Sequence, residues 1–253
     1  MYDVLSAQVG GRLAALGRLG RFCREMALAV RDVGTWNGLV LVQMRRIGVQ
    51  SLPIGLFIAA FTGVVLALQS SYTFTGSVPL YFVGTLVGKT IMLELAPVLT
   101  GLALAGRVGA NVAAELGTMR VSEQVDALET LAYNPFSYLV VPRVLAATLM
   151  FPLVVGLAMA TGVISGWITA VNLLDLSSVE FAKGLQLFYQ FKDVWFGLVK
   201  AMSFGFAVSL IGCLQGLHVR GGAEGVGRAA TRAVVVSAEV ILVLDAFWAL
   251  TLL

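Results

Sequence analysis

The chain alternates between long apolar runs and short polar segments. No charged residue occurs between Ile47 and Gly88 or between Val144 and Leu174. Both runs exceed the roughly 20 residues that an α-helix needs to cross the hydrocarbon core of a bilayer. With the apolar segments that follow, the pattern predicts membrane-spanning helices over residues 52–72, 86–110, 144–171, 194–217 and 233–253. We therefore expect an all-α integral membrane protein with one membrane domain over residues 1–253.

Residues 1–50 precede the first predicted span and carry a different pattern. From Leu16 to Val33, apolar residues recur every three or four positions, and charged residues occupy the opposite side of the helical wheel. The apolar set is Leu16, Leu19, Phe22, Met26, Val30 and Val33, and the charged set is Arg18, Arg21, Arg24, Glu25, Arg31 and Asp32. This pattern predicts an amphipathic helix in the membrane interface, with its basic face toward anionic headgroups. Packing on a partner's surface is the alternative.

The longest polar interruption runs from Glu115 to Arg143, between the second and third predicted spans. Its charged residues are Glu115, Arg120, Glu123, Asp126, Glu129 and Arg143, and it contains Pro135 and Pro142. Its apolar residues include a short run at helical spacing, so a short helix outside the membrane is expected here.

Small residues lie at intervals of four along the second predicted span and just beyond it: Gly101, Ala105, Gly109 and Ala113. In lipid, apolar side chains gain little by leaving the acyl chains for one another, so helices associate where small residues let two backbones approach. We expect this row to be a packing seam.

Composition and charge agree with a membrane protein and give its orientation. The chain is 58% hydrophobic and 12% charged, whereas soluble domains average about 25% charged residues. With the spans above, the arginines lie on or near one side of the membrane and the lysines on or near the other. The positive-inside rule then places the N-terminus and the Glu115–Arg143 stretch in the cytoplasm and the C-terminus outside.

Motifs for catalysis or nucleotide binding are missing or incomplete. Residues 84–90, GTLVGKT, have one residue too few between the glycines for a P-loop and lack a preceding strand. Gly225-Val226-Gly227 is only a fragment of a dinucleotide fingerprint. The single histidine, His218, cannot build a catalytic triad, and no cluster has metal-ligand spacing. We expect a chain that is not an enzyme, with no metal site, no cofactor and no nucleic-acid partner.

Four ionisable residues inside the predicted spans are candidates for function, because charge in lipid usually marks a pathway or a pair. Glu94 and Lys200 lie at similar depths from the outer side, so they are expected to face each other or a shared wet cavity. Glu239 and Asp245 share the fifth span but point to different faces, and Asp245 near mid-bilayer must be protonated, paired or hydrated. For each residue, a purely structural interhelical hydrogen bond is the alternative.

The run ELAPVLTGLALAGRVGANVAAELGTMRVSEQVDALETLAYNPFSYLVVPRVLA, from Glu94 to Ala146, resembles the signature region of the MlaE/YrbE family. These proteins are permease subunits of bacterial phospholipid ABC transporters that work with MCE proteins. The segment GGAEGVGRAATRAVV and the final VLDAFWAL extend the similarity more weakly. Ala96 replaces a glycine usual in the family, and Leu93 stands where some members carry arginine.

The resemblance implies an assembly in the bacterial inner membrane. The permease would be a homodimer that binds two cytoplasmic ABC ATPases, which hold ATP and magnesium, and a periplasmic ring of MCE proteins, with a small STAS-domain protein as a further partner. A coupling helix for the ATPase is expected within residues 119–132, where Glu123, Asp126, Ala127 and Leu128 match the family motif. Glu94, Lys200 and Asp245 match polar positions of the family, which carries lipid in a cavity between protomers.

The expected function is therefore ATP-driven transport of phospholipid between the inner membrane and the MCE partner. A proton- or ion-coupled secondary carrier acting through Glu94, Glu239 and Asp245 is the alternative, although an odd number of spans suits it poorly. A membrane scaffold without a transport role would leave the intramembrane charges without a purpose.

Overall fold

The computed structural model describes residues 17, 20–74, 79–174 and 176–252, and none of these residues lies in a β-strand. Five helical stretches are long and apolar enough to cross a membrane. They are Val33–Thr73, Phe82–Val121, Phe136–Leu173, Phe191–Leu217 and Gly222–Thr251. The predicted fold class, an all-α membrane protein with five apolar helical stretches, is confirmed.

Short irregular turns interrupt the first three stretches. The first comprises α2 (Val33–Ile47), the 3₁₀ turn η1 (Val49–Ser51) and α3 (Leu52–Thr73). The second comprises α4 (Phe82–Thr90), the π-helical η2 (Ile91–Leu95), α5 (Ala96–Leu104), the π-helical η3 (Ala105–Gly109) and α6 (Ala110–Val121). The third joins the π-helical η4 (Phe136–Val140) to α8 (Val141–Leu173). π-Turns of this kind are often found at functional sites.

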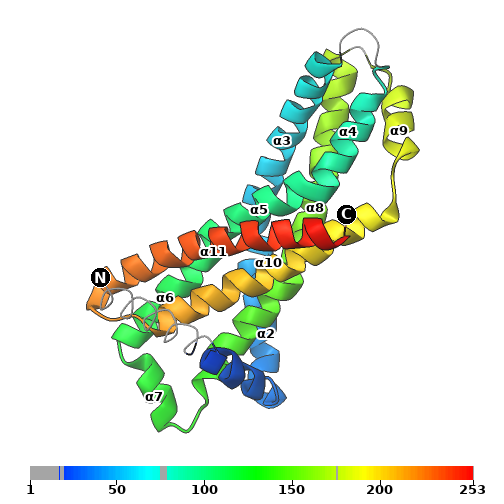
Figure 1. Ribbon diagram of the computed structural model, residues 1–253. Helices are drawn as coiled ribbons and strands as arrows, with labels where there is room; N and C mark the ends of the chain where they lie inside the picture. The colour runs from blue at the N-terminus through cyan, green and yellow to red at the C-terminus, as the bar shows by residue number, and fades with distance from the viewer. Residues whose placement is uncertain (1–16, 18–19, 75–78, 175, 253) are drawn as a thin grey trace, which may run out of the picture.

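The remaining helices are α7 (Gln124–Thr130), α9 (Ser178–Leu187), α10 (Phe191–Leu217) and α11 (Gly222–Leu252). The helix α3 packs along α8, α8 packs against α10, and α10 contacts both α6 and α11. Figure 1 shows α7 and the helix over residues 20–29 at one end of the molecule, with α9 at the opposite end.

The N-terminal helix ends earlier than the amphipathic pattern predicts. Residues 20–29 are helical, a turn follows at Val30 and Arg31, and α2 begins at Val33. The indole N–H of Trp36 donates to the carbonyl of Val30 at 2.9 Å, which satisfies one of the carbonyls that a helix end leaves free. Leu16, Arg18 and Leu19 lie outside the described residues, and the position of this helix on a membrane stays a prediction.

The last helix begins earlier than predicted, at Gly222 rather than near residue 233. The polar residues before the fifth apolar segment were expected to form a loop, but only Gly221 and Gly222 take the left-handed backbone conformation of a turn, with φ of 93° and 66°. Beyond them Glu224 and Arg228, one helical turn apart, form an ion pair at 3.0 Å. Such a pair favours helix over loop.

On the other side of the molecule, α9 begins with a capping box. The Ser177 hydroxyl donates to the Glu180 carboxylate at 2.8 Å, the Ser177 backbone N–H donates to it at 3.1 Å, and the Glu180 N–H donates back to the hydroxyl. These hydrogen bonds to the charged form lower the pKa of Glu180. They fix the start of α9, which packs against α4.

Small residues line the closest helix contacts. A side chain added at Gly63 of α3 would meet the backbone carbonyl of Gly162 in α8. In the row predicted from the second span, Gly101 faces Phe204 and Gly109 faces Val208, both on α10. Ala105 and Ala113 of the same row are fully buried.

We predict that Gly63→Ala destabilises the protein by about 1–3 kcal/mol, because the added methyl group collides with backbone that cannot move aside. Gly38→Ala is the matched control, since a methyl group there meets nothing within 4 Å. Thermal unfolding of the purified protein in detergent measures both. Equal melting temperatures for the two variants would contradict the proposed α3–α8 contact.

Candidate functional site

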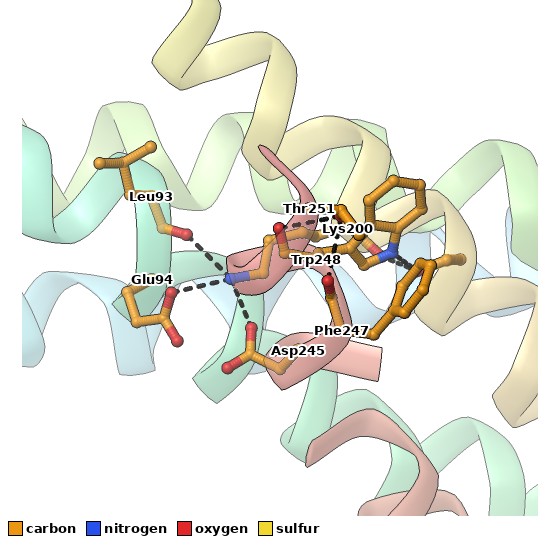
Figure 2. Close-up of polar contacts among 8 residues, drawn as sticks. Leu93, Glu94, Lys200, Asp245, Phe247, Trp248 and Thr251 are labelled. Atoms are coloured by element: carbon orange, nitrogen blue, oxygen red, sulfur yellow. Dashed lines mark hydrogen bonds and ion pairs between the residues drawn. The ribbon is translucent and has the colours of Figure 1, made fainter. Parts of the chain in front are cut away.

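A buried lysine at the centre of the membrane helices holds the intramembrane ionic cluster, which consists of Glu94, Lys200 and Asp245. Lys200 of α10 has no exposed surface. Its ammonium nitrogen lies 2.8 Å from Glu94 Oε2 and forms a second ion pair with Asp245 of α11. Figure 2 shows the two carboxylates converging on the Lys200 Nζ from different helices. Glu94 and Lys200, expected to face each other, are in direct contact.

A third ligand of the ammonium group is the backbone carbonyl of Leu93, at 3.3 Å. This carbonyl is available because Pro97, four residues later, has no N–H to donate to it. The same region adopts the π-helical turn η2, which includes Leu93 and Glu94. Proline and the π-turn together therefore expose a backbone acceptor within the second stretch, and the lysine uses it.

The charges of the cluster are unevenly exposed. The side chain of Lys200 is 0% exposed, that of Asp245 is 15% exposed and that of Glu94 is 43% exposed. Removing a charge from water is costly unless a close partner compensates it. The buried charges of Asp245 and Lys200 thus compensate each other. Glu94 lies on the side of the cluster that faces the protein surface.

A hydrogen-bond chain one turn further along α10 and α11 supports the cluster. The Trp248 indole N–H donates to the Ser203 hydroxyl at 3.0 Å, and that hydroxyl donates to the Lys200 carbonyl at 2.7 Å. The Lys200 ammonium also lies 5.1 Å from the centroid of the Phe196 ring, a distance typical of a cation–π contact. These contacts hold the α10 backbone and the lysine side chain in register with α11.

Glu239, the fourth intramembrane candidate, lies apart from the cluster. Glu239 is exposed on α11, and it takes part in none of the ion pairs among the described residues. The expectation that Glu239 and Asp245 point to different faces of the helix agrees with this geometry. The three carboxylates of the secondary-carrier hypothesis are therefore not gathered at one place.

A second ionic network lies at the α7 end of the membrane helices. The Glu115 carboxylate of α6 pairs with Arg143 of α8 at 2.9 Å and with Arg46 of α2 at 3.3 Å. Arg143 is 4% exposed at its side chain and also donates to the Leu139 carbonyl at 2.7 Å. The sequence showed Glu115 and Arg143 only as charged residues of the polar interruption, because nothing in their spacing shows that α6 and α8 meet there.

The residues expected to contact an ATPase lie on and beside α7. Glu123, Asp126 and Ala127 are exposed, and Leu128 is half-buried. Asp126 forms an ion pair with Arg120 at the end of α6. Within the predicted range 119–132, the structure therefore contains the last turn of α6, a bend and α7.

The described residues hold no cluster of three His, Cys, Asp or Glu side chains that could bind a metal ion. Cys23 and Cys213 are free thiols.

Removing only the lysine of the cluster should destabilise the fold strongly. Lys200→Met leaves Glu94 and Asp245 without their cation, and breaking a buried pair in this way costs about 3–5 kcal/mol. The triple variant Lys200→Met, Glu94→Gln, Asp245→Asn should recover most of this loss, because no uncompensated charge remains. Lys192→Met, an exposed position on the same helix, is the control. Thermal unfolding in detergent checks the series, and a triple variant no more stable than Lys200→Met would contradict it.

Comparisons with known proteins agree on one family. The family model described as Permease MlaE matches residues 40–251. A probable ABC transporter permease protein of Rickettsia prowazekii is 44% identical over 205 residues, which are 81% of this chain and 79% of the relative. The intermembrane phospholipid transport system permease protein MlaE of Haemophilus influenzae is 33% identical over 244 residues, covering 96% of this chain and 94% of the relative. With the five apolar helical stretches above, these matches show that the chain belongs to the MlaE permease family.

Proposed function

We propose that this chain is the permease subunit of an ATP-driven lipid transporter, which moves phospholipid between the bacterial inner membrane and a periplasmic MCE protein. Its membership of the MlaE permease family makes it a multi-pass membrane permease. The observation that carries the finer proposal is α7, an exposed acidic helix held at the end of the membrane helices.

The helix α7 has the geometry of a docking lever. Only Val125 of α7 is fully buried, while most of its other residues face outward. Both flanking residues, Glu123 and Ala132, have φ of 60°, a left-handed conformation that residues with a Cβ rarely adopt. The chain therefore turns sharply on each side of α7, so that a partner bound there would push on the helix as a unit.

A displacement of α7 would be transmitted directly to the membrane helices. The Arg120–Asp126 ion pair ties α7 to the end of α6, and α6 is the last segment of the helical stretch Phe82–Val121. That stretch also contains Glu94 and the Leu93 carbonyl of the ionic cluster. Closure of two ATPases on α7 would thus shift the second stretch against α10 and α11.

The same proposal assigns the partners of the chain and their positions. Two copies of the chain would enclose lipid between them, with the least buried span, Gly222–Thr251, available for contacts outside the chain. ATP and magnesium would be held by separate cytoplasmic ABC ATPases, with a small STAS-domain protein as a further partner. The MCE protein would bind at the α9 end, and the N-terminus would be cytoplasmic and the C-terminus periplasmic.

The secondary carrier remains the competing function, since Glu94 and Asp245 do share one cation. It predicts gradient-driven transport by the chain alone. Gentle solubilisation followed by copurification separates the two functions: an ATPase and an MCE protein recovered with the chain support the transporter, and their absence favours the carrier.

Reversing the charge of Glu123 or Asp126 should uncouple the transporter. Glu123→Lys and Asp126→Lys place a cation where the partner ATPase meets an acidic helix, so lipid transport in the assembled complex should fall about tenfold or more while the chain stays folded. Glu224→Lys is the control, because Glu224 is also an exposed, ion-paired carboxylate but belongs to the start of α11 rather than to α7. Lipid-stimulated ATPase activity and lipid transfer measure the effect in reconstituted complexes. Full lipid-stimulated activity in both α7 variants would overturn the coupling role.

A further inference from the structure

A pocket of about 750 Å³ lies between α2, η1 and the η3–α6 end of the second stretch. We call it the α2–α6 pocket, and its polar lining includes Gln43, Arg46, Ser51, Arg107, Asn111 and Glu115. Its volume falls within the about 300–1,000 Å³ that small-molecule sites usually have. None of Glu94, Lys200 and Asp245 lines it, so the pocket is separate from the ionic cluster, and Gln124 at the start of α7 lies at its edge.

Arg107 is the best-positioned cation of this pocket. It lies on the π-helical turn η3 and is half-buried. One of its guanidinium nitrogens donates to the Ser51 hydroxyl at 2.7 Å, and that hydroxyl donates to the Ile47 carbonyl at 2.5 Å. The buried serine thus fixes the guanidinium with a single contact, although arginine has five N–H donors.

The charges of the pocket do not balance within the described chain. Arg107 takes part in none of its ion pairs. The carboxylate of Glu115 is shared between Arg46 and the buried Arg143. Arg46 and Arg107 therefore leave an excess of positive charge. An arginine near lipid without a carboxylate partner favours an anion from outside, and guanidinium groups bind phosphate in bidentate fashion.

A separate apolar groove lies further along the same pair of helical stretches. Phe61, Val65 and Leu66 of α3, with Leu95 and Leu99 of the second stretch, line it. Ten residues of helix separate Ser51 from Phe61, which corresponds to a rise of about 15 Å. This is about half of the roughly 30 Å hydrocarbon core, the thickness of one leaflet. Ser51 directly precedes the predicted span 52–72, so the polar pocket lies at the headgroup depth of the cytoplasmic leaflet, whereas the groove begins near mid-bilayer.

We propose that the α2–α6 pocket binds the phosphodiester group of a phospholipid from the cytoplasmic leaflet, with its acyl chains in the surrounding bilayer. This inference rests on the membrane orientation and lipid substrate of the proposed function. Arg107 is the phosphate-binding residue, Arg46 adds charge at the rim, and Asn111 offers an amide to the polar headgroup. The pocket is a loading or holding site separate from the Glu94–Lys200–Asp245 cluster.

Photo-crosslinking of the full-length chain in its assembled complex tests the occupant. A photoreactive amino acid replaces Asn111, which lines the pocket and is exposed, or Asn37, an exposed control on α2 outside it. The complex is reconstituted in phosphatidylcholine vesicles that contain phosphatidylglycerol, or diacylglycerol as a lipid without phosphate. We expect phospholipid adducts at position 111 but not at position 37, with no diacylglycerol adduct at either position.

The role of Arg107 in phosphate binding is tested by the variant Arg107→Gln, with Arg45→Gln as the matched control. Arg45 is a neighbouring exposed arginine on α2 that does not line the pocket. The adduct should fall about tenfold in Arg107→Gln, the factor expected for one charge-assisted hydrogen bond, and should be unchanged in Arg45→Gln. Equal adducts in the two variants would overturn the role of Arg107.

Other occupants give different results. Displacement of the phospholipid adduct by millimolar inorganic phosphate would show a site for free phosphate and overturn the lipid assignment. Adducts to a second copy of the chain would make the pocket a protomer contact, which also overturns it. Lipid transfer by the same complexes separates this inference from the proposed function: transfer without an adduct refutes only the pocket, and an adduct without transfer refutes only the transporter.

Discussion

The buried ammonium group of Lys200 needs anionic partners, and this need determines how three parts of the membrane domain sit together. Glu94 and the Leu93 carbonyl come from the second stretch, and Asp245 comes from α11. In hydrocarbon no water is present to replace any of them. Separating these helices would therefore leave the Lys200 charge without a partner. The helices are thus restricted to arrangements in which the members of the cluster stay in contact or are all hydrated. Glu94 is the most exposed member of the cluster, so its carboxylate is the group that water can reach most easily.

The same charges explain why the second stretch is irregular. A regular α-helix would use every interior carbonyl itself, but Pro97 and the π-turn η2 leave the Leu93 carbonyl for the lysine. A second π-turn, η3, carries Arg107 and directs it to Ser51. Both departures from α-geometry thus coincide with a polar contact to another helix. Irregular backbone at membrane depth is tolerated where neighbouring groups satisfy it, and at η2 the Lys200 ammonium satisfies the Leu93 carbonyl.

The sequence predicted the features that depend only on the length of an apolar run or on the depth of a residue in the membrane. Apolar length located the five stretches, and similar depth placed Glu94 opposite Lys200. The sequence did not show that Asp245 also pairs with Lys200, because the rotation of α11 about its own axis depends on its packing against α10 and α6. The Arg46–Glu115–Arg143 network and the Arg107–Ser51 bond were missed for the same reason. The early start of α11 was missed because glycine spacing resembled a loop, although only Gly221 and Gly222 turn the chain.

The second stretch carries charged and polar residues that contact several other elements. From its α9 end to its α7 end it carries Glu94, Arg107, Glu115 and Arg120 in turn, and each bonds to a different partner on another element. A helix held by several charged contacts cannot slide freely, since each ångström of motion lengthens more than one of them at once. Such an element moves between discrete arrangements in which the pairs are re-formed. In the proposed transporter, energy applied at α7 would then be transmitted as a switch between these pairings.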